Sequence, residues 1–332
     1  MPPRAWKEVT VRTWNQSWLD NIGLVAAGVT FYGFLALVPL LGILILTYGL
    51  FAQPATVIQH VLTLLEILPP EIVVLIGQLL MNAVQASEQT SGLGILGALA
   101  VALYAGSNGA GAVMTALNIA YEETEKRSLL RFYAVAFAIT LVGVIIGVIA
   151  LAAMAVVAEL EKLLPKASGA LLIAGKVGLY LVMACFAAGI AATLYRFGPS
   201  REGARWQWLT PGSIFTAIVW LLMAIGFSLY VTKLTDYNAT YGSIAAIVML
   251  LTWMYLSAYV FLFGAELNAE LEHQTAKDST TGNPRPLGKR GAWVADHIAG
   301  AKDEGLSDKG PSLAEAGPPP PVDEAAASGR GQ

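Results

Sequence analysis

The chain has 332 residues, of which 56% are hydrophobic and only 13% are charged, and its mean hydropathy is +0.61. A soluble domain carries about 25% charged residues, so this chain has too little charge to cover a water-facing surface, and we expect lipid around most of it. The net charge of −3 carries little information, and the single cysteine, Cys185, excludes an intrachain disulfide framework. No removable signal peptide is expected, because the first residues lack a short apolar stretch with a small-residue cleavage site.

Residues 1–20 are predicted to form an interfacial helix on the cytoplasmic side of a membrane. Trp6, Trp14 and Trp18 lie there among basic residues, and tryptophan is enriched where a bilayer meets water.

Six apolar runs follow, each long enough to cross a bilayer, which requires about 20 mainly apolar residues. They lack the alternation of barrel strands and must be helical, because lipid cannot satisfy open backbone groups. The sequence therefore predicts an all-α, polytopic bundle with a membrane domain at 21–272. The expected spans are about 23–51, 92–117, 132–158, 170–195, 209–232 and 240–267.

The segment 53–91 between the first two spans contains two shorter apolar stretches, 57–68 and 71–89, each with a polar stripe. We interpret them as amphipathic helices on the outer membrane surface. A re-entrant hairpin broken at Pro69 and Pro70 is the alternative.

The distribution of Lys and Arg predicts the orientation, since these residues favour cytoplasmic connections. Eleven lie on the side of both termini and four on the other, so we expect both termini in the cytoplasm. The eleven are Arg4, Lys7, Arg12, Lys126, Arg127, Arg131, Arg196, Arg201, Arg205, Lys277 and Arg285; the four are Lys162, Lys166, Lys176 and Lys233.

Residues 273–332 are rich in Gly, Pro, Ser, Ala and mixed charge, and cannot bury a core. They are predicted to be a disordered cytoplasmic tail, with a short island at 293–298 that could form a transient helix.

Small residues recur at helical spacing in the second and third spans, which lets helix backbones approach closely in lipid. Packing within one chain is the plainer interpretation, and a face for homo-oligomerisation is the other. The residues are Gly94, Ala98, Ala102, Gly106 and Ala110, followed by Gly143 and Gly147.

Polar or helix-breaking residues inside spans are the default functional candidates. They could line a cavity or gate, or only fix helix ends, as an Arg196–Glu266 pair would. The candidates are Pro39, Asn108, Asn118, Arg196, Asp236, Tyr241, Glu266 and Asn268.

Catalytic patterns are missing from the sequence. The three histidines have no metal-site spacing with carboxylates, and the glycine-rich stretch 106–111 lacks the lysine and preceding strand of a phosphate loop. We therefore expect no enzyme activity, no metal, no cofactor and no nucleic-acid partner.

Four blocks resemble the YihY/BrkB family of bacterial inner-membrane proteins, historically labelled ribonuclease BN. Gly33 is a minor departure from its pattern. The blocks are Ala26-Ala27-Gly28 through Phe31-Tyr32 to Leu37-Val38-Pro39; Leu117-Asn118-Ile119-Ala120-Tyr121 with Lys126-Arg127; Arg196-Phe197-Gly198-Pro199 with Trp208 and Pro211-Gly212; and Tyr241-Gly242 with Trp253 and Gly264 to Ala269.

The resemblance implies a multi-pass protein of the bacterial inner membrane. Members are described as permeases or transport-like proteins, and one branch is linked to serum resistance. The leading hypothesis is a permease or lipid-handling protein whose partners are the bilayer and an unidentified solute or lipid. An envelope scaffold is the alternative, and an RNA-processing enzyme the least favoured one, because no acid–base pair or metal cluster is visible.

Overall fold

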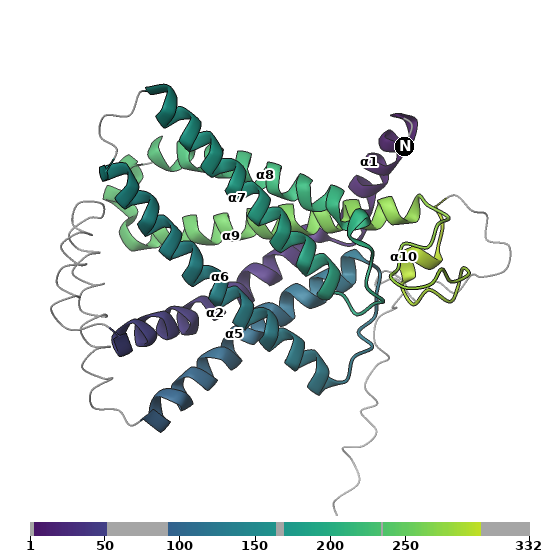
Figure 1. Cartoon of the computed structure of the whole chain (residues 1–332), viewed down its shortest axis with the longest axis horizontal. Helices are drawn as coiled ribbons and strands as arrows, with labels where there is room; N and C mark the ends of the chain where they lie inside the picture. Colours follow the sequence, from purple (N-terminus) through teal and green to yellow (C-terminus); the bar gives the residue numbers. More distant parts are fainter. Residues whose placement is uncertain (1–2, 52–91, 164–168, 234, 300–332) are drawn as a thin grey trace, which may run out of the picture. The chain divides into compact units, whose positions relative to one another are not determined.

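The computed structural model describes residues 3–51, 92–163, 169–233 and 235–299, and these residues form helices and connections (Figure 1). Within them no strand forms, and one isolated antiparallel bridge joins Ala204 to Thr280. The helices are α1 (Pro3–Leu19), α2 (Ile22–Phe51), α5 (Gly92–Ala120), α6 (Leu129–Leu163), α7 (Gly169–Phe197), α8 (Trp206–Lys233), α9 (Thr235–His273) and α10 (Trp293–Asp296).

The all-α prediction is confirmed for the described residues, and each of the six apolar runs falls on one long helix. Three helical segments there are long and apolar enough to cross a membrane: Leu129–Ile146, Trp206–Phe227 and Ile247–His273. A fourth results if the bent pair Ala5–Leu19 and Ile22–Leu37 counts as one broken span. The amphipathic helices expected within 53–91 lie outside the described residues.

Helix α1 meets α2 at a bend of 62°. Asn21 makes the turn in the left-handed region (φ 52°), which asparagine tolerates better than most residues. Trp14 and Trp18 are 55% and 70% exposed, as an interfacial helix requires. The predicted helix at the N-terminus is therefore present, and it packs on α9, where Trp14 meets the ring of Phe263 edge-on.

The long helices pack as two groups joined by α9. Helix α2 packs on α5, α6 packs on α5, and α8 packs on both α7 and α9. Helix α9 also contacts α1, α2 and α5, so it touches both groups. The main buried cluster includes Ile22, Leu117, Tyr121, Tyr195 and Leu262.

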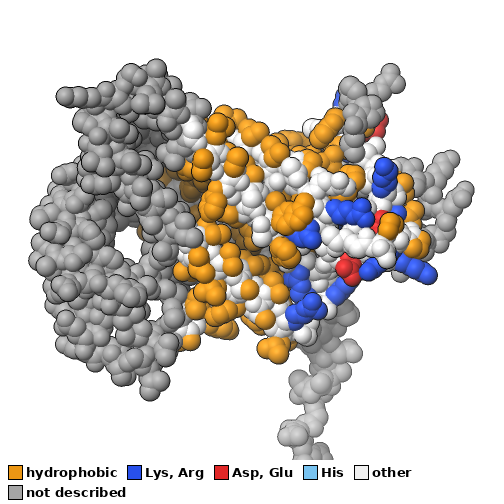
Figure 2. Space-filling model, in the orientation of Figure 1, with side chains coloured by type: hydrophobic (Ala, Val, Ile, Leu, Met, Phe, Trp, Pro, Cys, Tyr) orange, Lys and Arg blue, Asp and Glu red, His pale blue; other side chains and the backbone are white. Residues whose placement is uncertain are grey.

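That cluster lies at one end of the bundle, where α5, α7 and α9 finish and α6 and α8 begin. We call it the basic end, because its connections and the adjoining helix turns carry Lys126, Arg127, Arg131, Arg196, Arg201 and Arg205. Figure 2 shows Lys and Arg gathered at this end beside a broad hydrophobic belt. Exposed leucine, valine and isoleucine along α6, α7 and α8 make such a belt suited to lipid.

The small-residue stripe contributes only in part to helix contacts. Gly109 brings α5 against α2: a Cβ there would lie 3.1 Å from the Cβ of Ala36 and 3.6 Å from the Cα of Gly33. Gly106 and Ala110 are buried, whereas a Cβ added at Gly143 would meet nothing within 4 Å. The environments of Gly94, Ala98, Ala102 and Gly147 lie outside the described set.

The prediction that disorder begins at residue 273 is wrong for residues 274–298, which we call the C-terminal cap. The N–H of Thr281 donates to the carbonyl of Gly203 (2.9 Å), and the N–H of Trp293 donates to Glu123 Oε1 (2.6 Å). Val294 and Ala295 are buried. The composition of this segment predicted disorder because the segment has no hydrophobic core of its own. It is ordered instead by its contacts with the helical bundle. Nearly all residues beyond 298 lie outside the described set.

Candidate functional site

An apolar cavity of about 720 Å³ lies in the middle of the bundle and is partly open. Helices α2, α5, α6, α7, α8 and α9 all contribute to its wall. Pockets for small ligands have volumes of roughly 300–1,000 Å³, so the cavity has the size of a binding site. Its wall is almost free of polar groups, which suits a hydrocarbon chain. Lining residues include Gly33, Ala36, Gly109, Gly143, Leu194, Trp220, Met254, Ala258 and Phe261.

A smaller groove of about 440 Å³ lies between α2, α5 and α6. It is more polar, because Tyr32, Ser107, Asn108 and Thr115 line it. Asn108 is exposed there. The sequence-based choice of Asn108 as a cavity residue therefore stays a prediction that is consistent with its position.

Tyr195 lies next to the large cavity, on the side of the basic end. Its hydroxyl donates to the carbonyl of Phe261 (2.7 Å) and lies 2.8 Å from the hydroxyl of Thr216. Tyr195 is fully buried, and its ring stacks on Phe261, which lines the cavity. This contact joins α7, α8 and α9 beside the cavity.

Two glycines below Tyr195 make the crossing of α8 and α9. A Cβ at Gly264 would collide with Thr216 Oγ1 and lie 2.6 Å from the Tyr195 hydroxyl, and a Cβ at Gly212 would strike the Gly264 carbonyl. Proline before Gly212 has no N–H and disturbs helical bonding. The freed N–H of Gly212 donates to Asn268 Oδ1 at 2.7 Å. Asn268 thus fastens the two helices together.

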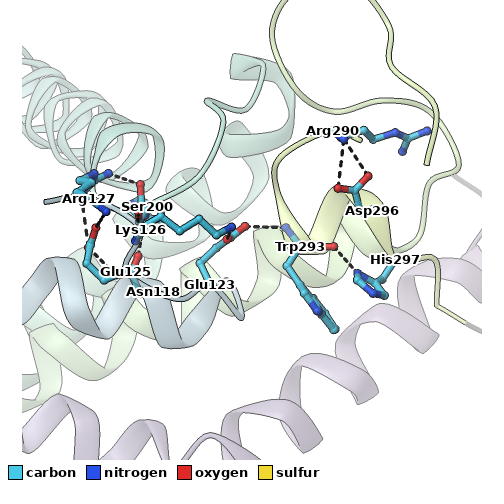
Figure 3. Close-up of polar contacts among 11 residues, drawn as sticks. Asn118, Glu123, Glu125, Lys126, Arg127, Ser200, Arg290, Trp293, Asp296 and His297 are labelled. Carbon is cyan, nitrogen blue, oxygen red and sulfur yellow. Dashed lines mark hydrogen bonds and ion pairs between the residues drawn. The ribbon is translucent and has the colours of Figure 1, made fainter. Parts of the chain in front are cut away.

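Asn118 fastens the end of α5 to the connection after α7. Its Oδ1 accepts the N–H of Ser200 (2.7 Å), and its Nδ2 donates to Glu125 (3.0 Å), as Figure 3 shows. Partial burial alone would raise the pKa of Glu125, but hydrogen bonds from the Arg127 N–H and Asn118 hold it below its usual range. The Arg127 guanidinium donates to the carbonyls of Phe197, Gly198 and Pro199.

A buried ion pair joins the same connection to α9. Arg201 Nη2 lies 2.7 Å from Glu272 Oε1, and both side chains are 0% exposed. The guanidinium also lies 4.2 Å from the ring centre of Tyr121. Ser279 of the C-terminal cap donates to Glu272 Oε2 (2.7 Å), so this pair orders the cap as well.

Four carboxyl groups crowd together where the α1–α2 link meets α5 and α9. Gln16 Nε2 donates to Asp20 (3.1 Å) and to Glu122 (3.4 Å). Glu266 is completely buried next to Asp20, and Glu270 accepts the Nε–H of Arg12 at 2.7 Å. We call Asp20, Glu122, Glu266 and Glu270 the carboxyl cluster.

The pKa of Glu122 is raised to about 7, first by burial and then by the charges of Asp20 and Glu270. A raised folded-state pKa means that Glu122 favours folding below pH 4.5 and loses that contribution as pH rises through 7. We expect Glu122→Gln to remove this loss, with a gain on the order of 2 kcal/mol above pH 8 and little effect at pH 5. Thermal unfolding in detergent at both pH values measures it, and equal changes would contradict it.

The Arg196–Glu266 pair that the sequence allowed is not formed. The guanidinium of Arg196 lies 4.8 Å from the ring centre of Trp206 and donates to the carbonyl of Ala204 (2.7 Å). Glu266 lies next to Asp20 instead. Helix spacing alone cannot say which face of α9 turns toward α7.

The remaining candidates predicted from the sequence lie on helices, but the structure does not describe their side chains. Pro39 lies within α2, and Asp236 and Tyr241 lie in the first turns of α9, but their side chains are outside the described set. Tyr195, Arg201 and Glu272 were missed as site residues. Arg201 was read as a topological charge, because nothing in its sequence neighbourhood points to Glu272, its partner on α9.

No three His, Cys, Asp or Glu side chains within the described residues group closely enough to hold a metal ion. The arrangement at the basic end can instead bind protons and fix helices.

A family model described as "Virulence factor BrkB" matches residues 13–287. The chain belongs to the BrkB family. The resemblance seen in the four sequence blocks is thereby confirmed. Three of these blocks meet in the structure, because Asn118, Arg196 to Pro199, Gly212 and Gly264 to Ala269 all lie at the basic end.

Relatives of this BrkB-family chain are bacterial. It is similar to the ribonuclease-like protein YfkH of Bacillus subtilis (strain 168), with 31% identity over 179 residues, covering 51% of this chain and 62% of YfkH. A UPF0761 membrane protein of Rhodospirillum centenum is 27% identical over 81% of this chain and 59% of its own length. A UPF0761 membrane protein of Alteromonas mediterranea is 28% identical over 81% of this chain and 90% of its own length.

The chain thus spans about three fifths of the length of YfkH and of the Rhodospirillum protein. No solved structure matches the chain. These relatives establish a membrane protein family with apolar helices.

Proposed function

We propose that this protein is a multi-pass permease or lipid-handling protein of the bacterial inner membrane, acting on a molecule with a hydrocarbon chain and without a covalent step. The observation that carries the proposal is the apolar cavity of about 720 Å³, bordered by six long helices. In a bilayer such a cavity has no reason to fill with water, whereas an acyl chain matches its wall.

The proposed topology has six spans with both termini in the cytoplasm. Its support is the six long helices and the basic residues gathered at one end (Figure 2). The test is labelling of single cysteines by a membrane-impermeant maleimide in the Cys185→Ser chain. Leu287→Cys should react only after permeabilisation, and Ser168→Cys in intact spheroplasts; the reverse pattern would overturn the orientation.

In this proposal the cavity is closed toward the basic end by Tyr195 and by the crossing of α8 and α9, which hydrogen bonds hold together. A lipid-like substrate would therefore enter from the side or from the opposite end in this conformation, and the basic end would have to open for transfer. The basic connections offer charges near which an anionic headgroup could be held.

Filling the cavity should abolish activity. Gly143 lines the cavity, and a Cβ added there meets nothing within 4 Å, so Gly143→Phe can be accommodated without a clash at its Cβ. We expect this variant to lose most phospholipid binding and transfer, measured with fluorescent phospholipids in proteoliposomes of the full chain.

Gly189→Phe is the matched control. A Cβ at Gly189 likewise meets nothing within 4 Å, but this residue does not line the cavity. It should behave as the parent protein does. Equal activity of the two variants, or no transfer and no bound lipid in the parent, would contradict the proposal.

A further inference from the structure

The carboxyl cluster contains more acidic groups than the neighbouring basic residues can neutralise. Arg12 pairs with Glu270, to which its Nε–H donates at 2.7 Å, and His273 Nδ1 lies 3.8 Å from the same carboxylate. Gln16 supplies neutral N–H donors to Asp20 and Glu122.

Glu266 has no such partner. Its side chain is fully buried, and neither of its oxygens accepts a hydrogen bond from an N–H or hydroxyl donor among the described residues. The group close enough to hydrogen-bond with it is the carboxyl of Asp20. A carboxyl can donate to another carboxyl only when one of them carries a proton, so a hydrogen bond between Asp20 and Glu266 would hold a proton.

The charged groups that act on Glu266 come from three elements. Asp20 comes from the α1–α2 link, Glu122 from the end of α5, and Glu270 from α9, and all three are acidic. The nearby Tyr121 is neutral and stands between Glu266 and the Arg201–Glu272 pair, whose charges compensate each other. Two ionised carboxylates at this buried position would lack compensation.

We propose that Asp20 and Glu266 form a proton-binding site that holds one shared proton, and that loss of this proton opens the basic end beneath the cavity. The coupling to opening rests on the proposed function; proton binding does not. The site joins the α1–α2 link to α9, and both α2 and α9 line the cavity, so the shared proton would hold together two helices of the cavity wall.

The position of Glu266 on α9 explains how loss of the proton would move this helix. Glu266 lies between Gly264, at the closest approach of α8 and α9, and Asn268, which bonds to α8. Without the proton, two like charges face each other, and their repulsion pushes α9, with α8, away from the α1–α2 link. The raised pKa of Glu122 reports the same accumulation of negative charge.

Infrared spectroscopy of the full chain in lipid tests proton binding. The Glu122→Gln background removes the other carboxyl expected to hold a proton near pH 7. At pH 7 the carbonyl band of a protonated carboxylic acid should be present, and both Asp20→Asn and Glu266→Gln should abolish it. Glu202→Gln, at an exposed position, should leave it unchanged.

A band that is absent from the parent, or that survives Asp20→Asn, overturns the proton site. The result for Asp20→Asn is sufficient to overturn the proton site, so the test remains valid even if Glu266→Gln does not fold.

Cysteine accessibility tests the coupling separately. In the Cys185→Ser chain, Ser257→Cys places a thiol on the cavity wall. Between pH 7 and pH 9 its maleimide labelling should rise several-fold more than that of Leu287→Cys, at an exposed position in the same background, and Glu266→Gln should remove this excess. Loss of the infrared band with no excess labelling would keep the proton site and overturn the coupling, while the lipid-transfer assay judges the proposed function on its own.

Discussion

Gly264→Ala should prevent stable assembly of the bundle. The added methyl group would collide with Thr216 Oγ1 and lie 2.6 Å from the Tyr195 hydroxyl and 2.9 Å from the Gly212 carbonyl. Two of these neighbours are held by a hydrogen bond to each other and the third is backbone, so none can yield without moving a helix. We expect a loss of about 3 kcal/mol or more, as for severe overpacking, seen as loss of folded protein in detergent or a large fall in unfolding temperature.

Gly189→Ala provides the control for helix propensity. It makes the same chemical change in a long helix where a Cβ meets nothing within 4 Å. Alanine favours helix over glycine by about 1 kcal/mol in water-exposed hosts, so this variant should be as stable as the parent or slightly more so. Comparable destabilisation by both substitutions would show that the α8–α9 contact is not as close as described.

Glu272→Gln should cause the second large effect. It leaves Arg201 charged and fully buried, with its main partner replaced by a neutral amide, and it weakens the bond from Ser279. Breaking a buried pair on one side costs about 3–5 kcal/mol. Thermal unfolding should show this loss, and limited proteolysis should cut the C-terminal cap faster, since the hydrogen bond from Ser279 is weakened.

Two further variants distinguish the cost of leaving Arg201 buried without a charged partner from a general effect of removing a charge. Arg285→Ala removes a pair in which the side chains are 45% and 50% exposed and the atoms are 3.7 Å apart, so it should change stability by less than about 1 kcal/mol. The double variant Arg201→Met with Glu272→Leu replaces both buried charges by apolar groups and should recover much of the stability. No recovery would indicate that Ser279 or Tyr121 depends on the charges themselves.

The sequence was sufficient for features that depend on one helix at a time. Run length and the absence of alternation gave the positions of the long helices, and tryptophans among basic residues gave α1. Boundaries differed mainly where a helix leaves the apolar region: α9 extends to His273, six residues beyond the predicted span end, because its last turns pack on α1 and the C-terminal cap.

The sequence was insufficient for features that depend on the rotation of one helix against another. Arg196 and Glu266 lie at matching depths, yet one stacks on Trp206 and the other faces Asp20. The carboxyl cluster draws on residues 20, 122, 266 and 270, which are separated by up to 250 positions. Asn118 and Asn268 were found because polar residues near span ends are rare, but their partners, Ser200 and Gly212, contribute backbone N–H groups that no side-chain pattern reveals.

The C-terminal cap has a consequence for biosynthesis. Glu123 and Gly203 are made long before Trp293 and Thr281, whose N–H groups they bind. During translation the long helices can therefore enter the membrane before the C-terminal cap is made, and the cap residues, which leave the ribosome later, then complete the contacts at the basic end. Nascent chains arrested before residue 274 should keep their helices but be open to cytoplasmic proteases at the connections after α5 and α7. The cap thus acts as a completion step that separates insertion from final assembly.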